Sequence, residues 1–358
     1  MDRLTREKLE EFLSRIGANC IVVEERDRYF ILSCTKKGKY EVQKRIVEEL
    51  GYPASIIGKR EIYVYRMKPE AKARVELDYD VVKQRLDPED RDSAFGYGVP
   101  KLCLVGNTYP VKEVLKSYGF KFEPLRKAWC RIFNSFSELR SFVKDSLPSL
   151  IQECAEKGVA VELSDDELKD AVERLRNELE WHNKTSFISF FRFYATTKGD
   201  PDVVSEVARS VGEDEVADQV ERIAKEFDSF GDAVEVVAMP RSSNALLVCA
   251  RPRKYLGKQL FRAFVEKARS LGMSSIDTNT YCETVHAEKT PLVYEEAVYA
   301  LARAETDEPE AINEALEYLK HKGIQIDRET FEKLVHRVKH AFYDVVTKAK
   351  SKLLEVLT

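Results

Sequence analysis

The pattern of apolar and polar positions predicts small units in which short strands alternate with amphipathic helices. In residues 1–68, apolar side chains recur at helical spacing in two segments and form three strand-like segments. The predicted helices cover 4–16 and 37–50, and the predicted strands cover 20–23, 29–34 and 61–66. Residues 233–290 show the same ββαβ order, with strands at 234–238, 245–250 and 275–277 and a helix at 255–271. Because the two sequences are not alike, the shared order is a recurring unit rather than a demonstrated repeat.

A third unit is predicted between them, at residues 100–147. An apolar run with strand character is followed by a helix that Thr108 and Pro110 start and Gly119 ends. Two more strands and a closing helix complete a βαββα order. The predicted strands are 102–105, 120–122 and 128–133, the turn is 123–126, and the last helix begins at Ser135.

The remaining segments are predicted to connect these units. Residues 69–99 are acidic and contain Gly96-Tyr97-Gly98, which predicts a loose linker. Residues 148–232 are acidic and predicted helical, with Ser164 and Glu167 as a capping box. Residues 291–358 are predicted to form helices alone. The sequence therefore predicts an α+β, multi-domain protein, in which small modules with antiparallel or mixed sheets are joined by helical segments and followed by a helical C-terminal region.

Charge alternates along the chain, although the formal net charge is only −4. Residues 100–147 carry nine Lys and Arg against four Asp and Glu, whereas residues 148–232 carry ten against twenty-one. In the central unit the cations alternate with Tyr109, Phe120, Phe122 and Trp129. Nucleic acid needs cations for its phosphates, and a single strand also needs ring faces for its unstacked bases. We therefore predict single-stranded or forked DNA or RNA as the partner.

The predicted nucleic-acid-binding residues fall in all three basic units. In the central unit they are Asn107, Tyr109, Lys112, Lys116, Lys121, Phe122, Arg126, Lys127, Trp129 and Arg131. In the flanking units they are chiefly cations close to a helix N-terminus, where the helix dipole disfavours them unless an anion is bound. They are Lys36, Lys37 and Lys39 in the first unit, and Arg241, Arg251, Arg253, Lys254 and Lys258 in the last.

Residues 106–129 carry the pattern G-N-T-Y-P-x-K-x-x-L-K-x-x-G-F-x-F-x-x-x-x-K-x-W. This pattern resembles a small module attached to polyvalent proteins of plasmids and phages, and it is distantly similar to the HARP domain of annealing helicases. The resemblance covers about 40 of the 358 residues. It implies a setting in replication, repair or a mobile element. No G-x-x-x-x-G-K-[ST] loop accompanies it, so no helicase motor is predicted.

Composition adds expectations about the setting of the protein. Charged residues make up 34% of the chain while Asn and Gln are few, which is typical of a thermophile and favours an archaeal origin. No apolar run is long enough for a membrane span and no signal-peptide core is present, so we expect a cytoplasmic protein without a membrane partner. The seven cysteines are odd in number and irregularly spaced, which favours small buried strand residues over a disulfide framework or zinc ribbon, although the interiors of hyperthermophile proteins sometimes form disulfides.

Two other functions stay open at the level of sequence. The acidic helical segments could dock copies of the chain, as in a viral or scaffolding subunit. Asp78 and Asp80 form a D-x-D pattern that could hold a divalent metal in a nucleic-acid enzyme, although no third ligand follows in register. No nucleophile or dinucleotide motif is present. The residues thus favour a non-enzymatic protein, and we expect no cofactor.

Overall fold

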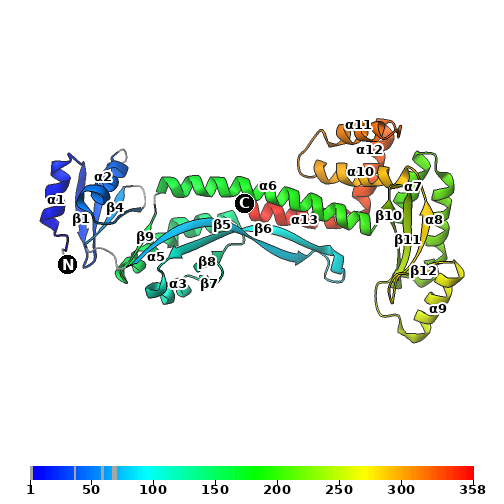
Figure 1. Ribbon diagram of the computed structural model, residues 1–358, viewed down its shortest axis with the longest axis horizontal. Coiled ribbons are helices and arrows are strands. Elements are labelled where there is room, and N and C mark those ends of the chain that lie inside the picture. Colours follow the sequence, from blue (N-terminus) through cyan, green and yellow to red (C-terminus); the bar gives the residue numbers. More distant parts are fainter. Residues whose placement is uncertain (1–2, 36–37, 58–59, 67–70, 164) are drawn as a thin grey trace. The chain divides into compact units, whose positions relative to one another are not determined.

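A computed structural model describes residues 3–35, 38–57, 60–66, 71–163 and 165–358. The chain forms two compact units (Figure 1). Unit 1 comprises Met1–Val82, Tyr97–Asn183 and Lys352–Thr358, and unit 2 comprises Lys83–Gly96 and Lys184–Ser351. Helices account for 54% and strands for 24%, with antiparallel and mixed sheets and a helical C-terminal region. The predicted α+β, multi-domain class is confirmed.

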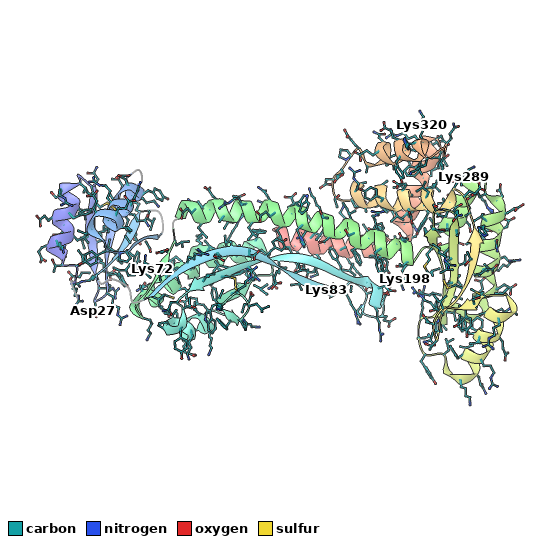
Figure 2. The ribbon with its side chains drawn as sticks, viewed as in Figure 1. Asp27, Lys72, Lys83, Lys198, Lys289 and Lys320 are labelled. Atoms are coloured by element: carbon teal, nitrogen blue, oxygen red, sulfur yellow. A yellow bond between two sulfur atoms is a disulfide. The ribbon has the colours of Figure 1, made fainter. Side chains whose placement is uncertain are left out.

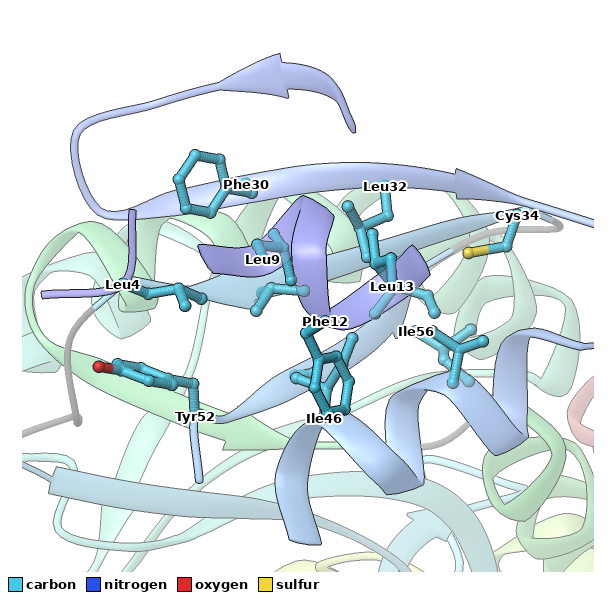
Figure 3. Close-up of a cluster of buried hydrophobic side chains, with 14 residues drawn as sticks. Leu4, Leu9, Phe12, Leu13, Phe30, Leu32, Cys34, Ile46, Tyr52 and Ile56 are labelled. Atoms are coloured by element: carbon cyan, nitrogen blue, oxygen red, sulfur yellow. The ribbon is translucent and has the colours of Figure 1, made fainter. Parts of the chain in front are cut away.

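Unit 1 begins with a four-stranded antiparallel sheet that two helices cover. Its elements are α1 (Arg6–Arg15), β1 (Cys20–Glu25), β2 (Tyr29–Cys34), α2 (Lys39–Arg45, continued by a π turn at Ile46–Leu50), β3 (Ala54–Ile57) and β4 (Glu61–Tyr65). The strand order is β1-β2-β4-β3. Phe12 and Leu13 of α1 and Ile46 pack against Phe30 and Leu32 of β2 in the buried cluster of Figure 3. The predicted ββαβ order is found, with one further strand, β3, that was not predicted from the sequence.

A five-stranded mixed sheet forms the centre of unit 1. Its strands are β5 (Ala71–Arg85), β6 (Ala94–Gly106), β7 (Lys121–Glu123), β8 (Ala128–Ile132) and β9 (Val159–Glu162), in the order β7-β8-β6-β5-β9. The strands β5 and β9 pair in parallel, whereas the β6–β8 and β7–β8 pairs are antiparallel. The helices of this part are α3 (Lys112–Ser117), α4 (Phe136–Ser141) and α5 (Leu147–Glu156). The predicted βαββα order at 100–147 is therefore found.

The prediction of a loose linker at residues 69–99 is wrong. The described part of this segment forms β5 and the start of β6, two long neighbouring strands of the central sheet. Figure 2 labels Lys72 and Lys83 near the two ends of β5. Residues 74–81 alternate between polar and apolar side chains, as in a half-buried strand. The acidic residues of this segment led to the prediction of a linker, although the alternation indicates a strand.

The helix α6 (Asp165–Thr197) contributes residues to both units. The predicted cap residue Ser164 lies outside the described residues. Within unit 1, the buried Asn183 side chain accepts a hydrogen bond from the Gly98 N–H at 2.6 Å and donates one to the Gly98 carbonyl at 3.3 Å. A Cβ at Gly98 would meet Leu179 at 2.4 Å. Glycine is thus needed where α6 crosses β6 closely.

Unit 2 contains an antiparallel four-stranded sheet and a group of helices. The sheet consists of β10 (Val234–Ser242), β11 (Ala245–Pro252), β13 (Tyr281–His286) and β12 (Ser274–Ser275), in this spatial order. The helices are α7 (Pro201–Ser210), α8 (Asp214–Glu226), α9 (Gly257–Ser270), α10 (Thr290–Ala304), α11 (Ala311–His321), α12 (Arg328–Ala341) and α13 (Tyr343–Leu357), the last of which ends in unit 1. The α10 helix packs against β10, α7, α11 and α12. The strand β13, and β9 in unit 1, were not predicted from the sequence.

Each of the three sheets contains one disulfide. The bonds are Cys20–Cys34 between β1 and β2, Cys103–Cys130 between β6 and β8, and Cys249–Cys282 between β11 and β13. Each pair occupies directly opposed positions in antiparallel neighbours. These six cysteines are strand residues, as expected, whereas Cys154 lies in α5, and the prediction that the cysteines form no disulfide framework is wrong. The seventh, Cys154, is buried, and its burial raises the pKa of the thiol to about 12.

Candidate nucleic-acid interface

Tyr109 is presented to solvent by a short turn that its neighbours anchor. Thr108 and Val111 are buried on either side of Tyr109 and Pro110. The Val111 N–H donates to the Thr108 carbonyl at 3.1 Å, which closes the turn. Tyr109 is 74% exposed, and the Lys112 ammonium lies 4.7 Å from its ring centroid. Ring and cation therefore form one exposed pair at the start of α3.

A second ring pair lies on the β7–β8 hairpin. Phe122 and Trp129 are directly opposed, with ring centroids 5.6 Å apart. Because β7 is an edge strand, Phe122 has a neighbouring strand on one side only, and it is 50% exposed, while Trp129 is half-buried. The connecting turn places Lys127 in the left-handed region at φ 50°. The hairpin thus presents both rings on one face of the sheet and the exposed Lys127 in its turn, while Lys121, next to Phe122 in β7, is exposed on the other face.

The other predicted cations of the central unit are held by protein groups. Lys116 pairs with Glu113 at 2.9 Å. Arg126 pairs with Asp78, and the hydrogen bond and charge of this carboxylate raise the pKa of the guanidinium. Arg131 donates to the Tyr118 carbonyl at 2.8 Å and lies over the rings of Phe133 and Phe142. By contrast, Lys121 and Lys127 form no ion pair with any described residue.

Asn107 lies at the end of β6, in an exposed position beside the Tyr109 turn. Its backbone N–H donates to the Lys72 carbonyl at 3.0 Å. Seven of the predicted residues of the central unit are at least partly exposed and form no ion pair with a described residue: Asn107, Tyr109, Lys112, Lys121, Phe122, Lys127 and Trp129. We call these residues the central surface.

The D-x-D carboxylates serve as counterions for two cations of the same sheet. Asp78 and Asp80 lie on one face of β5, because strand side chains alternate. Asp80 pairs with the buried Lys101 at 3.5 Å, and Asp78 pairs with Arg126. Glu123 also contacts both cations, at 3.3 and 3.8 Å. Among the described residues, no group of three or more His, Cys, Asp or Glu side chains is arranged to hold a metal ion.

The basic segment of the first unit contributes no accessible cation among its described positions. Lys36 and Lys37 lie outside the described residues. Lys39 is only 4% exposed, and its ammonium lies 4.9 Å from the Tyr40 ring centroid. A ligand at the surface would not reach Lys39 in this position.

The predicted cations of the last unit divide into three groups. Arg251 and Arg253 both pair with Glu235. Arg241 lies in the β10–β11 hairpin, at the opposite end of the sheet, and donates to the Thr284 hydroxyl at 2.9 Å. Lys254 and Lys258 are exposed and form no ion pair within the described residues. The structure therefore does not bring these five residues together.

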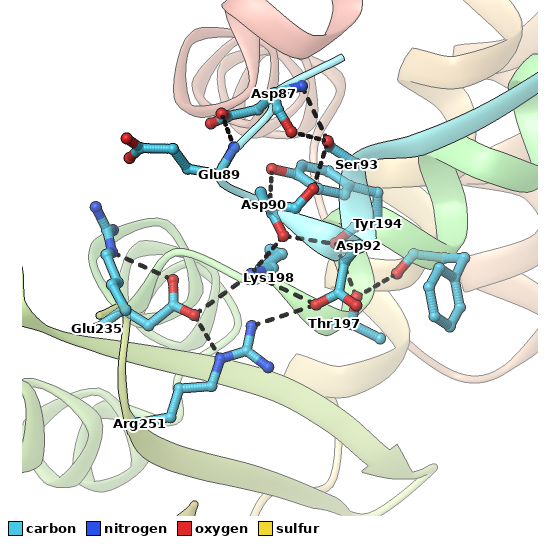
Figure 4. A network of polar contacts seen from close by, with 12 residues as sticks. Asp87, Glu89, Asp90, Asp92, Ser93, Tyr194, Thr197, Lys198, Glu235 and Arg251 are labelled. Carbon is cyan, nitrogen blue, oxygen red and sulfur yellow. Dashed lines mark hydrogen bonds and ion pairs between the residues drawn. The ribbon is translucent and has the colours of Figure 1, made fainter. Parts of the chain in front are cut away.

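A polar groove of about 1000 Å³ in unit 2 was not predicted. Figure 4 shows its central network, in which the Lys198 ammonium contacts Asp90 at 3.2 Å, Asp92 at 3.5 Å and Glu235 at 3.3 Å. The Tyr194 hydroxyl donates to Asp90 at 2.9 Å. These groups come from the β5–β6 turn, the end of α6 and β10, so no sequence motif joins them.

Charge is nearly balanced within this network. Burial disfavours the ionised form of Asp90, but hydrogen bonds from the Asp92 N–H and Tyr194 and the charge of Lys198 outweigh it and lower the pKa of Asp90. The pKa of Tyr194 is raised, chiefly by burial and then by the charge of Asp90. Lys198 contacts carboxylates from the turn and from β10, so the network links the β5–β6 turn to the sheet of unit 2.

No helix in the described part of the chain is long and apolar enough to cross a membrane. Comparisons of the chain with protein-family models, with curated proteins and with solved structures found no match. The resemblance of residues 106–129 to the polyvalent-protein and HARP modules therefore remains a prediction from their motif.

Proposed function

We propose that this protein binds single-stranded nucleic acid through the central surface, without catalysing a reaction. The observation that carries the proposal is the exposed pair of the Tyr109 ring with Lys112, together with the Phe122–Trp129 ring pair on a hairpin whose turn holds the exposed Lys127. Exposed rings offer stacking faces to unpaired bases, and the lysines offer charge to the phosphates. In a duplex the base faces are already stacked, so single strands or forked ends fit this surface better.

Replacing the two most exposed rings of the central surface, Tyr109 and Phe122, is expected to weaken the binding of nucleic acid strongly. Each stacked base contributes about 1–3 kcal/mol, so Y109S/F122S should bind a fluorescent oligothymidylate at least tenfold more weakly in a fluorescence anisotropy titration. A second variant, K112S/K121S/K127S, should lower the magnitude of the slope of log K against log salt by about 2, because each phosphate contact to a single strand contributes about 0.7.

The control removes the same charge from the same unit. K72S/K157S/K169S replaces three exposed lysines that lie outside the central surface. This variant should keep most of the affinity. Equal losses in the control and in K112S/K121S/K127S would show that net charge rather than the central surface determines binding.

A second candidate function, assembly with further copies of the chain, has one supporting observation. Ile21 and Val23 lie on the edge strand β1 and are 67% and 51% exposed. Exposed apolar residues on an edge strand favour pairing with a second chain. If copies associate here, I21E/V23E should shift the mass measured by light scattering from an oligomer to a monomer. A wild-type protein that is monomeric at all concentrations would exclude this candidate.

A further inference from the structure

A row of accessible cations follows one side of α9. Lys258, Arg262 and Arg269 lie four and seven residues apart, so they share one side of the helix. All three are exposed, and none forms an ion pair with a described residue. Lys254 and Tyr255 come directly before the helix, and Tyr255 is 93% exposed. We call these five residues the α9 surface.

Packing of the opposite side fixes the orientation of this row. The buried Phe264 contacts the rings of Phe227, Phe230 and Tyr281, with centroids 5.7–6.1 Å apart. Ala268, one turn further on, is also buried. Because this apolar side is occupied by the core of unit 2, the cations are held toward solvent rather than free to turn inward.

The three cations of this row have no carboxylate partner among the described residues, unlike other cations of unit 2. Lys267, on the same helix, pairs with Glu226 at 2.8 Å. Arg251 and Arg253, just before the α9 surface, both pair with Glu235. Like charges spaced along one helix repel one another, which disfavours the folded state slightly. An anionic partner would remove this repulsion.

We infer that the α9 surface is a second binding surface for single-stranded nucleic acid, which shares no residue with the central surface. The inference rests on the proposed function and extends it to unit 2. At a rise of 1.5 Å per residue, Lys258 to Arg269 span about 16 Å, which is the length of a few nucleotides of a single strand. Tyr255 provides a free ring at one end of this row for an unpaired base.

An anionic membrane surface is a less suitable partner for these residues. A helix that lies in a membrane interface needs a free apolar side to bury in the lipid. The apolar side of α9 is occupied by Phe264 and its neighbours, and Leu260, 41% exposed, is its one exposed large hydrophobic side chain. Charge and a single free ring favour nucleic acid over lipid.

The test compares two matched triple variants of the full chain. Y255S/K258S/R262S removes one ring and two cations from the α9 surface. Y318S/K320S/K322S removes one tyrosine and one lysine from α11 and a second lysine from its C-cap, where the Lys322 ammonium lies 5.3 Å from the Tyr318 ring centroid. In an anisotropy titration with labelled oligothymidylate, the α9 variant should bind at least tenfold more weakly. Its salt slope should fall by about 1.4 in magnitude, and the α11 control should bind as the wild type does.

Comparison of the α9 variant with Y109S/F122S distinguishes the failure of this inference from the failure of the proposed function. If the α9 variant binds as the wild type does while Y109S/F122S loses affinity, the inference is overturned and the central surface stands. If only the α9 variant loses affinity, the inference stands and the central surface is excluded. Binding of the wild type to phosphatidylserine vesicles but not to oligothymidylate would overturn both.

Discussion

Reduction of the three disulfides is expected to lower the free energy of unfolding by about 3–4 kcal/mol for each bond. The bonds close loops of 14, 27 and 33 residues, and the entropy that such loops remove from the unfolded chain gives this magnitude. For units of this size, each bond should raise the melting temperature by roughly ten degrees. Circular dichroism melts with and without a reductant measure the difference.

Pairwise variants assign this effect to the units. C249S/C282S removes the bond of unit 2, and C20S/C34S and C103S/C130S remove those of unit 1. If the units unfold separately, each variant should shift only the transition of its own unit. Melting curves that coincide with and without reductant, after the thiols have been counted, would show that the bonds do not stabilise the protein.

Replacement of Lys198 by methionine is expected to destabilise unit 2 by about 3–5 kcal/mol. The Lys198 ammonium contacts three carboxylates, and the side chains of Lys198 and Glu235 are both only 13% exposed. Removing Lys198 leaves the partly buried Asp90 without a cation among the described residues, although Glu235 keeps its pairs with Arg251 and Arg253. The matched change K267M breaks a more exposed pair with Glu226 and should cost less than about 1 kcal/mol. Chemical denaturation measures both changes.

The same network predicts a loss of stability in acid. The pKa of Asp90 is lowered in the folded protein, so its ionised form stabilises the fold at pH values above the ordinary carboxyl pKa of about 4. This contribution is lost as the pH falls through the lowered pKa. Asp90→Asn should therefore remove part of the dependence of stability on pH below about pH 4. An unchanged pH profile in this variant would contradict the role of Asp90.

The local elements could be predicted because their signals lie close together in the sequence. Apolar periodicity gave the helices of the first and last basic units, and the order strand, helix, Gly119, hairpin gave the fold around Tyr109. The strand β5 was not predicted although residues 74–81 alternate between polar and apolar side chains, since its acidic residues were interpreted as a linker. The short β9 follows directly after α5 and gains its strand character from parallel pairing with β5.

Pairings between distant residues could not be predicted in the same way. Each disulfide depends on the register of two strands, which is set by turns and packing rather than by the spacing of cysteines. The contact of Arg126 with Asp78 joins a hairpin turn to a strand 48 positions earlier in the chain. Sequence reasoning could count cations near Trp129, but it could not tell which of them already have a carboxylate partner.

Fluorescence of Trp129 during titration with oligothymidylate tests the central surface most directly. Trp129 and Trp181 are the two tryptophans of the chain, so a W181F protein reports on Trp129 alone. Because the Phe122 and Trp129 rings lie 5.6 Å apart, a base that stacks on Phe122 would also approach Trp129. We predict a saturable quenching that weakens with salt and disappears in the additional variant Phe122→Ser. Binding by anisotropy without any change in Trp129 emission would place the nucleic acid elsewhere on the protein.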